Sequence, residues 1–165
     1  MKKAIILLFS GATILASCGG EKPAKQNTET TATEQPAATP ESVEFTINAI
    51  GNSMADMSYD TKEMKVKAGA MVKINLTNKG TDAAMLHNIV IVKQGTEKEV
   101  AMEGIPLKDK NYFNAQNPNV IAGSAVSEPG KTVTLEFTAP TAGTYTYICT
   151  YPGHWMKMQG VLIVE

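Results

Sequence analysis

The chain has 165 residues, and its 15 basic side chains, all of them lysine, nearly balance 16 Asp and Glu to a formal net charge of −1 at pH 7. This composition leaves no basic stripe, which excludes nucleic-acid binding through a positively charged surface. The chain also has only two cysteines and two histidines, so any site built from these side chains must draw on very few positions.

Residues 1–17 have the features of a signal peptide. Lys2 and Lys3 precede the uncharged apolar stretch "AIILLFSGATILA", which is too short for a membrane-spanning helix of about 20 residues. The stretch ends in "LASC", which resembles the lipobox of bacterial lipoproteins. That resemblance implies cleavage before Cys18 and attachment of lipid to its thiol. The alternative is an ordinary secretory signal followed by a chance cysteine.

Residues 18–42 predict a disordered tether between Cys18 and the rest of the chain. Thr, Ala, Glu, Gln and Pro dominate this segment, and such a composition buries too little apolar surface to fold. Two or more acyl chains on Cys18 would anchor the protein stably, because each buried methylene contributes roughly 0.8 kcal/mol. We therefore expect a protein outside the cytoplasm, lipid-anchored to a bacterial membrane on its periplasmic side or at the cell surface.

The remaining residues, 43–165, predict a single all-β domain. Short apolar segments with period-two alternation or β-branched runs are separated by turns that contain glycine or proline. The expected strands are 43–50, two strands within 63–80 joined at a Gly-Ala turn, 87–95, 131–140, 143–149 and 160–165. The nearly continuous β-branched run in 87–95 is typical of a strand in the middle of a packed sheet. Regular short strands of this kind favour an antiparallel sandwich.

One segment, residues 96–122, interrupts this pattern. It lacks period-two alternation and is long for a loop of a sandwich. Loops of this length usually contain secondary structure of their own or serve a function. We expect a helical excursion on the outside of the sandwich.

The chemistry is concentrated in "CTYPGHWMKM", residues 149–158, where Cys149, His154 and Met158 follow one another at intervals of five and four. The other histidine, His87, begins a predicted buried strand far away in the sequence. Two imidazoles, one thiolate and a weak axial thioether are the ligands of a blue-copper electron-transfer centre. Taken singly, a buried inert cysteine, a hydrogen-bonded histidine and one methionine of nine are the simpler interpretations. Their joint occurrence favours a copper site.

These motifs resemble those of the azurins and of the membrane-tethered auracyanins, within the cupredoxin family. The resemblance covers nearly all of 43–165 and is carried, in the order of the family, by "FTINAIGNSM", "LHN", "NPNVIAGS", "APTAGTYTYIC" and "CTYPGHWMKMQGVL". It implies a cupredoxin-type Greek-key β-sandwich with one type 1 copper per chain. It assigns the copper ligands to His87, Cys149, His154 and Met158.

The resemblance also implies roles for residues around the ligands. The Asn88 side chain would tie the two ligand segments together, and the backbone N–H groups of Asn88 and Tyr151 would point at the Cys149 sulfur. Many azurins have a glycine just before the first histidine, whose carbonyl approaches the metal. Leu86 stands there in this chain, and the N-terminal disulfide of azurins is missing. The missing disulfide favours the tethered branch of the family.

A copper with four protein ligands has no open position for a substrate, so we expect an electron carrier rather than an enzyme. The family's apolar docking patch beside the second histidine would here comprise Met85, Leu86, Tyr151, Pro152, Trp155 and Met156, with Met57 as a further neighbour. The alternative for Trp155 is that its side chain folds back into the core. We expect a monomer that meets its redox partners transiently, c-type cytochromes or membrane respiratory components, through weakly salt-dependent contacts.

Two other functions remain open at this stage. The nine methionines and the expected location outside the cytoplasm are also consistent with copper delivery or storage, which requires an exchangeable site. A relative of copper enzymes such as nitrite reductases would need a second copper and further histidines, and the chain has none to spare. Zinc is a competing occupant of the same ligand set, because affinity alone does not select copper.

Overall fold

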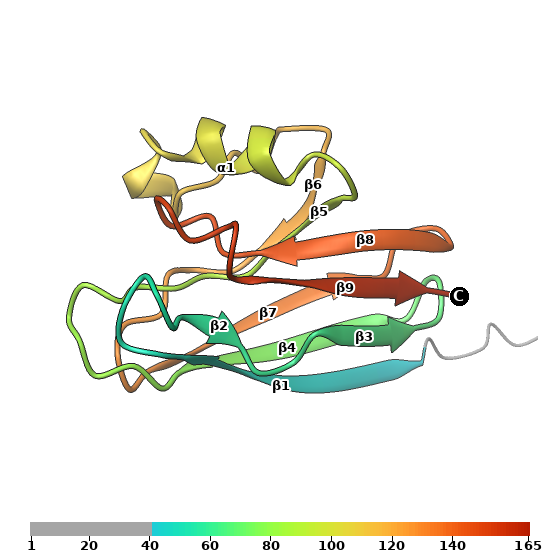
Figure 1. Ribbon diagram of the computed structural model, residues 1–165. Coiled ribbons are helices and arrows are strands. Elements are labelled where there is room, and N and C mark those ends of the chain that lie inside the picture. Colours follow the sequence, from blue (N-terminus) through green and yellow to red (C-terminus); the bar gives the residue numbers. More distant parts are fainter. Residues whose placement is uncertain (1–40) are drawn as a thin grey trace, which may run out of the picture. The chain divides into compact units, whose positions relative to one another are not determined.

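The computed structural model describes residues 41–165, which form two β-sheets and a short helical segment (Figure 1). The predicted segments 1–17 and 18–42, with the proposed lipid site at Cys18, lie outside the described residues, apart from the last two positions of the tether. One sheet has the strand order β2-β1-β4-β7 and the other β3-β9-β8-β5-β6. The strands are β1 (Ser42–Ile50), β2 (Ser58–Tyr59), β3 (Glu63–Val66), β4 (Met71–Asn78), β5 (Val90–Lys93), β6 (Val120–Gly123), β7 (Thr132–Thr138), β8 (Gly143–Ile148) and β9 (Gln159–Val164).

Alternating apolar residues place the core between the two sheets. In β4, Val72, Ile74 and Leu76 are buried, while the residues between them face outward. Ile74 lies opposite Leu135 of β7, so both strands present the same apolar face to the second sheet. Their side chains belong to one buried cluster with Tyr147, Leu162 and others of β8 and β9. The period-two pattern of these strands therefore positions the core as predicted.

The expectation of an antiparallel sandwich is wrong for two strand pairs. β1 runs parallel to β4, and β3 runs parallel to β9, whereas the remaining pairs are antiparallel. The two strands joined at the Gly-Ala turn do not form a hairpin, because β3 pairs in one sheet and β4 in the other. Between β1 and β4 the chain has the 20 residues 51–70, enough for the crossover that a parallel pair needs. Alternation reveals which face of a strand is buried but not the direction of its neighbour.

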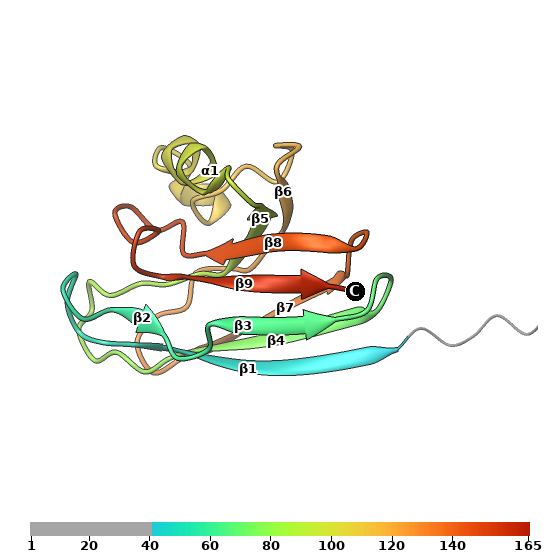
Figure 2. The ribbon, with the colours of Figure 1, turned by 45° about the vertical axis from the view of Figure 1, so that its right-hand side comes forward.

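The helical excursion is confirmed, and Figures 1 and 2 show it on the outer side of the sheet that contains β5 and β8. It consists of α1 (Glu97–Gly104) and the 3-10 helix Lys108–Lys110, followed by the unexpected strand β6. Val100 and Ala101 of α1 pack on Val90 and Val92 of β5 in a second buried cluster. Since Ile91 belongs to the main cluster, β5 is buried on both faces, as its β-branched run predicts.

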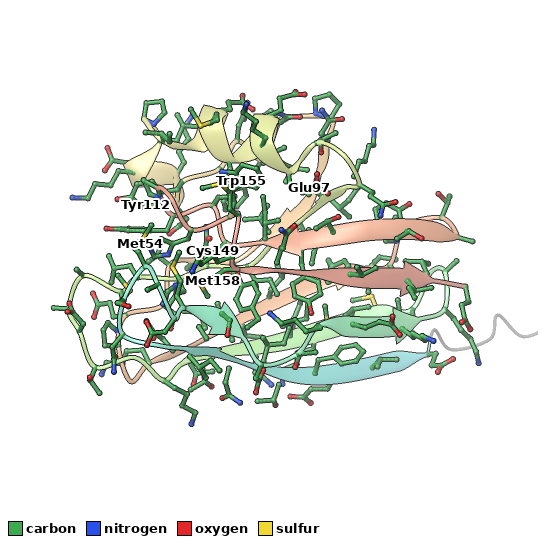
Figure 3. All side chains as sticks on the ribbon, viewed as in Figure 1. Met54, Glu97, Tyr112, Cys149, Trp155 and Met158 are labelled. Atoms are coloured by element: carbon green, nitrogen blue, oxygen red, sulfur yellow. The ribbon has the colours of Figure 1, made fainter. Side chains whose placement is uncertain are left out.

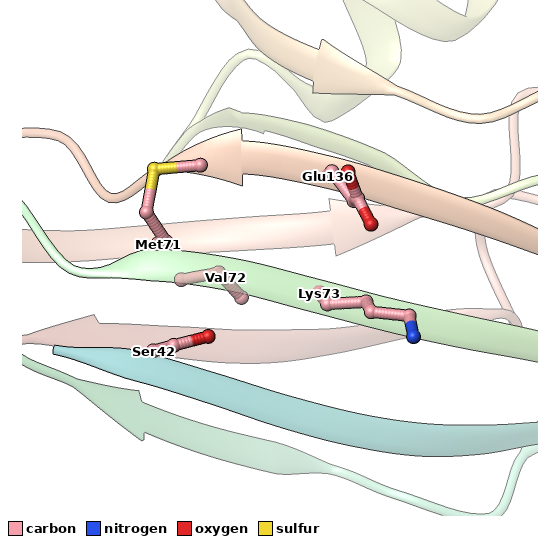
Figure 4. Close-up of a pocket in the computed structure, with 5 residues that line it drawn as sticks. All are labelled: Ser42, Met71, Val72, Lys73 and Glu136. Carbon is pink, nitrogen blue, oxygen red and sulfur yellow. The ribbon is translucent and has the colours of Figure 1, made fainter.

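At one end of the sandwich the loop between β8 and β9 lies near the connection that leads into β5, and Figure 3 labels Cys149 and Met158 there. At the other end of the first sheet a hollow of about 180 Å³ is lined by Ser42, Met71, Val72, Lys73 and Glu136 (Figure 4). Its lining has no histidine or cysteine. Within residues 41–165, no helix has the length and apolar character that crossing a membrane requires.

Candidate metal centre

Cys149 and His154 are positioned by the loop that joins β8 to β9. Cys149 directly follows β8, and its backbone N–H donates to the carbonyl of Met158 at 3.0 Å, which closes the loop at its base. Gly153 has φ +85°, in the left-handed region that glycine adopts without strain. Hydrogen bonds from His154 N–H to the Tyr151 carbonyl and from Met158 N–H to the His154 carbonyl, both 3.0 Å, tighten the turn. The sequence "PG" thus bends the chain so that His154 returns toward Cys149.

His87 reaches the same place from the connection before β5. It forms an isolated antiparallel bridge with Ser127, with its N–H donating to the Ser127 carbonyl at 3.2 Å and the reverse bond at 2.6 Å. The segment around Ser127 leads into β7 of the opposite sheet. His87 is therefore held between the two sheets rather than at a free strand end.

The structure brings three of the predicted ligands together. His154 Nδ1 lies 3.2 Å from His87 Nδ1, and the Cys149 sulfur lies 3.9 Å from His87 Nδ1 and 3.7 Å from His154 Nδ1. His87 and Cys149 are 0% exposed, and His154 is 1% exposed. Three donor atoms thus face one point in a site closed to solvent.

These separations fit a metal ion. Two imidazole nitrogens at about 2.0 Å and a sulfur at about 2.3 Å from one ion in a trigonal plane would stand about 3.5 Å (N···N) and about 3.7 Å (N···S) apart. The observed triangle of 3.2, 3.7 and 3.9 Å has this size. The soft sulfur and the two imidazoles are also the donor types that copper binds. The residues present therefore fit the metal that the sequence predicts.

The protonation states of the metal-free site suit metal binding. Burial lowers the pKa of both His87 and His154 to about 4, and for His87 the neighbouring His154 adds to the effect. Both imidazoles are therefore neutral at pH 7, with lone pairs available. Burial raises the pKa of the Cys149 thiol to about 11. The thiol carries its proton until a metal displaces it.

The fourth predicted ligand, Met158, is fully buried in the cluster that contains Cys149. Its position is fixed by the two backbone hydrogen bonds that close the loop, one to Cys149 and one to His154. Figure 3 shows Met158 and Cys149 at the same end of the sandwich. Met158 thus lies at the base of the loop that carries Cys149 and His154.

Asn88 connects the two ligand segments. Its side-chain Nδ2 donates to Thr150 Oγ1 and to the Asn111 carbonyl, both at 2.7 Å, and its Oδ1 accepts from the Thr150 N–H at 2.8 Å. The backbone N–H groups of Asn88 and Tyr151 are hydrogen-bonded to the Cys149 sulfur. Because Asn111 belongs to the excursion, this segment also supports the site.

The structure adds a contact that the sequence analysis missed. The Tyr59 hydroxyl donates to the Asn88 carbonyl, and Tyr59 belongs to the same buried cluster as Cys149. Tyr59 lies in β2, a strand of two residues outside the predicted strands. No motif in the sequence distinguishes this tyrosine from the other four.

The predicted docking patch needs correction. Met85 is only 7% exposed and Met57 only 2%, so neither offers a surface to a partner. The Asn78 side chain donates to the backbone carbonyl of Met85 at 2.7 Å. Trp155 is half-buried and packs against the second core cluster, so its folded-back alternative is partly correct. Met156, in contrast, is 63% exposed.

Leu86, Tyr151 and Pro152 remain partly exposed near His154. The Tyr151 ring lies 4.8 Å from the His154 ring between centroids, and Tyr112 of the excursion contacts Tyr151 edge-on at 5.0 Å. The surface beside the second histidine is thus formed by aromatic side chains from two segments rather than by methionines alone.

Comparison with known proteins agrees with this geometry. The family described as copper binding proteins, plastocyanin/azurin family, matches residues 46–165. The chain belongs to this family. Auracyanin-A of Chloroflexus aurantiacus is 40% identical over 119 residues, which span 70% of this chain and 72% of that protein. Azurin of Alcaligenes faecalis is 36% identical over 113 residues, or 64% of this chain and 88% of that protein.

Solved structures show the same relationship. The blue copper protein auracyanin A from Chloroflexus aurantiacus superposes with a TM-score of 0.67 at 38% identity, covering 75% of this chain and 99% of that one. Dithionite-reduced auracyanin from Roseiflexus castenholzii gives a TM-score of 0.67 at 36% identity, covering 76% and 98%. The predicted all-β cupredoxin fold is therefore confirmed. Copper is the family's cofactor, and His87, Cys149 and His154 form a group within metal-binding distance of one another.

Proposed function

We propose that this cupredoxin is a membrane-tethered electron carrier, with one type 1 copper held by His87, Cys149, His154 and Met158. The observation that carries the proposal is the buried triangle of two imidazole nitrogens and one sulfur, 3.2–3.9 Å apart. When bound, the copper supplies a one-electron couple. The protein's residues supply a fixed and dry donor set, in which the ligands need to move little when the charge of the metal changes.

The contacts around the ligands support this rigidity. The Asn88 side chain ties the His87 segment to Thr150 and Asn111 through three hydrogen bonds, and the isolated bridge with Ser127 fixes His87 from the connection that leads into β7. Such contacts orient metal ligands and tune the metal's properties. Four protein ligands would leave the copper no open position for a substrate, which favours electron transfer over catalysis.

Electrons would enter and leave at the His154 end. Tyr151 contacts the His154 ring, and Tyr112 contacts Tyr151, so an aromatic series leads from the ligand toward partly exposed residues. We propose transient contacts there with redox proteins such as c-type cytochromes or membrane respiratory components. The domain has eleven Lys and twelve Asp plus Glu in residues 43–165, so the contact should depend only weakly on salt.

The location follows from the sequence outside the described residues. We propose that residues 1–17 are removed, that Cys18 carries the lipid, and that 18–42 tether the domain to a bacterial membrane, on its periplasmic side or at the cell surface. Changing Cys18 to Ala should release the protein from the membrane fraction without changing its copper site. Retention of C18A in the membrane would contradict the lipid anchor.

The decisive experiment is addition of Cu(II) to the protein. An intense blue thiolate-to-copper absorption band and a reversible one-electron wave at an electrode are expected. Cys149→Ser should abolish the band, whereas Thr150→Val, which changes a neighbour without removing a ligand, should retain it. A colourless wild-type product, or colour that survives C149S, would end the proposal.

Copper delivery is the second candidate, and the exposed methionines Met54 and Met156, 47% and 63% exposed, are the observation that favours it. Thioethers at the surface bind Cu(I), and Met54 reaches the loop at Gly153, where its Cε lies 3.0 Å from the position a Cβ would take. Rapid loss of bound copper to a chelator, without a reversible wave, would favour delivery over electron transfer.

A further inference from the structure

Asn111 and Tyr112, which follow the 3-10 helix of the excursion, have an unfavourable backbone. Their φ angles are +58° and +60°, and within residues 41–165 they are the only non-glycine residues with positive φ. Asparagine tolerates this left-handed conformation, but a bulky aromatic residue adopts it rarely, because its Cβ approaches the following carbonyl oxygen. Tyr112 therefore stands at a position where glycine or asparagine would be the unstrained residue.

The surrounding chain enforces this conformation. The Tyr112 N–H donates to the Leu107 carbonyl at 2.9 Å, and the Tyr112 carbonyl lies so close to Gly104 that a Cβ there would be 1.9 Å from its oxygen. The Asn111 carbonyl accepts a hydrogen bond from the Asn88 side chain at 2.7 Å. Strained residues persist where their surroundings hold them in this way, and they concentrate at functional sites.

The enforced backbone places the Tyr112 ring beside the metal centre. Figure 3 shows Tyr112 at the end of the sandwich that carries Cys149. Its ring meets the Tyr151 ring edge-on, with centroids 5.0 Å apart and an interplanar angle of 70°, and the Tyr151 ring lies 4.8 Å from that of His154. Edge-to-face rings at this distance attract each other beyond the effect of burial. Tyr151 is therefore held between Tyr112 and His154.

His154 needs such support more than His87 does. The backbone of His87 is bonded in both directions to Ser127, a residue of another segment. The backbone hydrogen bonds of His154, in contrast, all go to residues of its own loop within the described part of the chain. The packing of Tyr151 on Tyr112 thus links the second imidazole to a segment outside the loop.

We propose that Tyr112 is a positioning residue of the metal centre, whose ring clamps Tyr151 against His154 and restricts the orientation of this imidazole. This inference rests on the proposed function, in which the ligands must move little when the charge of the metal changes. The strained backbone of Tyr112 then lowers the stability of the fold in return for a rigid ligand, as functional sites commonly do. Loss of the ring should loosen the site without loosening the fold.

Tyr112→Asn is the test, because asparagine tolerates the left-handed conformation but removes the ring. Tyr112→Phe keeps the ring and is the rescue control. Phe113→Leu is the matched control for packing, since the Phe113 ring packs on the second core cluster and lies 2.6 Å from where a Cβ of Gly123 would be. The three variants separate the ring contact from the backbone strain and from the packing of the core.

In the metal-free protein, hydrogen exchange of the His154 and Met158 N–H groups measures opening of the loop. We expect exchange to be about two- to tenfold faster in Y112N, the factor that corresponds to one edge-to-face pair, and unchanged in Y112F. The urea midpoint of Y112N should stay at or above that of the wild type, because relief of the backbone offsets the lost contact. F113L should have a lower midpoint.

In the copper-loaded protein, EPR of the Cu(II) form reports the orientation of the ligands. Y112N should show a broadened distribution of copper hyperfine splittings and lose copper to a chelator about tenfold faster, the lower end of what loss of a contact around metal ligands causes. Y112F and F113L should match the wild type in both. Unchanged exchange and EPR in Y112N, the same changes in F113L, or an equal fall of the urea midpoint in Y112N and F113L would overturn the proposal.

Tyr151→Leu keeps the test decisive if Y112N does not fold. This variant leaves the left-handed pair intact but removes the ring between Tyr112 and His154, so it should reproduce the faster exchange and the broadened EPR spectrum. Wild-type behaviour of Y151L would refute the assignment. The proposed function is judged separately, by the blue band and the reversible wave of the wild-type protein, whereas the exchange measurement needs no metal.

Discussion

Acid should destabilise the metal-free protein through its two histidines. Burial holds the pKa of His87 and His154 at about 4, against 6.5 for an exposed histidine. At pH values between these, the unfolded chain binds protons that the folded chain does not. The free energy of unfolding therefore has its highest value above pH 6.5. It falls as the pH is lowered from 6.5 through the folded pKa of about 4.

The magnitude follows from the number of protons. One proton difference gives a slope of about 1.4 kcal/mol per pH unit, and two give about 2.7. Over the full shift from 6.5 to about 4 this sums to an upper limit of about 7 kcal/mol for the pair. Relaxation of the site and entry of water when the imidazoles are protonated reduce this limit, and we expect roughly half of it, with a slope of about 1.4 kcal/mol per pH unit. A domain stable by 5–15 kcal/mol would lose a large part of its stability.

Urea unfolding of the protein in the presence of a chelator, at several pH values from 5.0 to 6.5, measures this slope. The chain has only these two histidines, and buried or hydrogen-bonded carboxylates such as Glu97 and Glu103, whose pKa is lowered from 4.5, titrate below the window. His154→Gln should reduce the slope by about half, with the urea dependence itself unchanged. A flat profile in the wild type, or an undiminished slope in H154Q, would refute the reasoning.

Three further outcomes are expected. Cu(II) binding at pH 7 should release about one proton, because the Cys149 thiol, with a pKa of about 11, is the only protonated ligand. Calorimetry in buffers of different ionisation enthalpy measures this number. Release of two or more protons would show that an imidazole was charged. Asn88→Ala should lower the free energy of unfolding by about 3 kcal/mol, because three side-chain hydrogen bonds are lost. The variant should also lose copper to a chelator faster than the wild type. An unchanged rate of copper release would contradict the role of Asn88 in connecting the two ligand segments. Gly104→Ala should lower the free energy of urea unfolding by more than about 2 kcal/mol, since the new Cβ would lie 1.9 Å from the Tyr112 carbonyl oxygen. Gly69→Ala places its Cβ in open space at φ +76° and should cost only about 1 kcal/mol. Equal effects of the two substitutions would contradict the close approach at Gly104.

Local patterns predicted much of the fold. Alternation assigned the buried faces of β1, β4 and β7, and the β-branched run identified β5 as a strand buried on both sides. The absence of alternation in 96–122 predicted the excursion with α1. These features depend on neighbours within a few residues, so a single sequence contains them. The strand β2 was missed because two residues carry too little periodicity, and β6 because its four residues are all half-buried and do not alternate.

The candidate site divides in the same way. The loop 149–158 contains its own geometry, since "PG" and three local hydrogen bonds bend His154 toward Cys149. His87 lies 62 residues before Cys149 in the sequence. Only the small number of histidines in the chain and the family resemblance indicated it as a ligand. Met85 is buried, at 7% exposure, although no local pattern in the sequence indicates it.

By itself, the sequence determined the donor types, the spacing of the Cys–His–Met loop and the apolar faces that make a sandwich. The tertiary structure alone decided the parallel pairing of β1 with β4, the meeting of both imidazoles with the sulfur, and the hydrogen bond of Tyr59 to the Asn88 carbonyl. The physical reason is range. Periodicity and turn chemistry act between close neighbours, whereas pairing partners and contacts across the core are set by the packing of the whole domain.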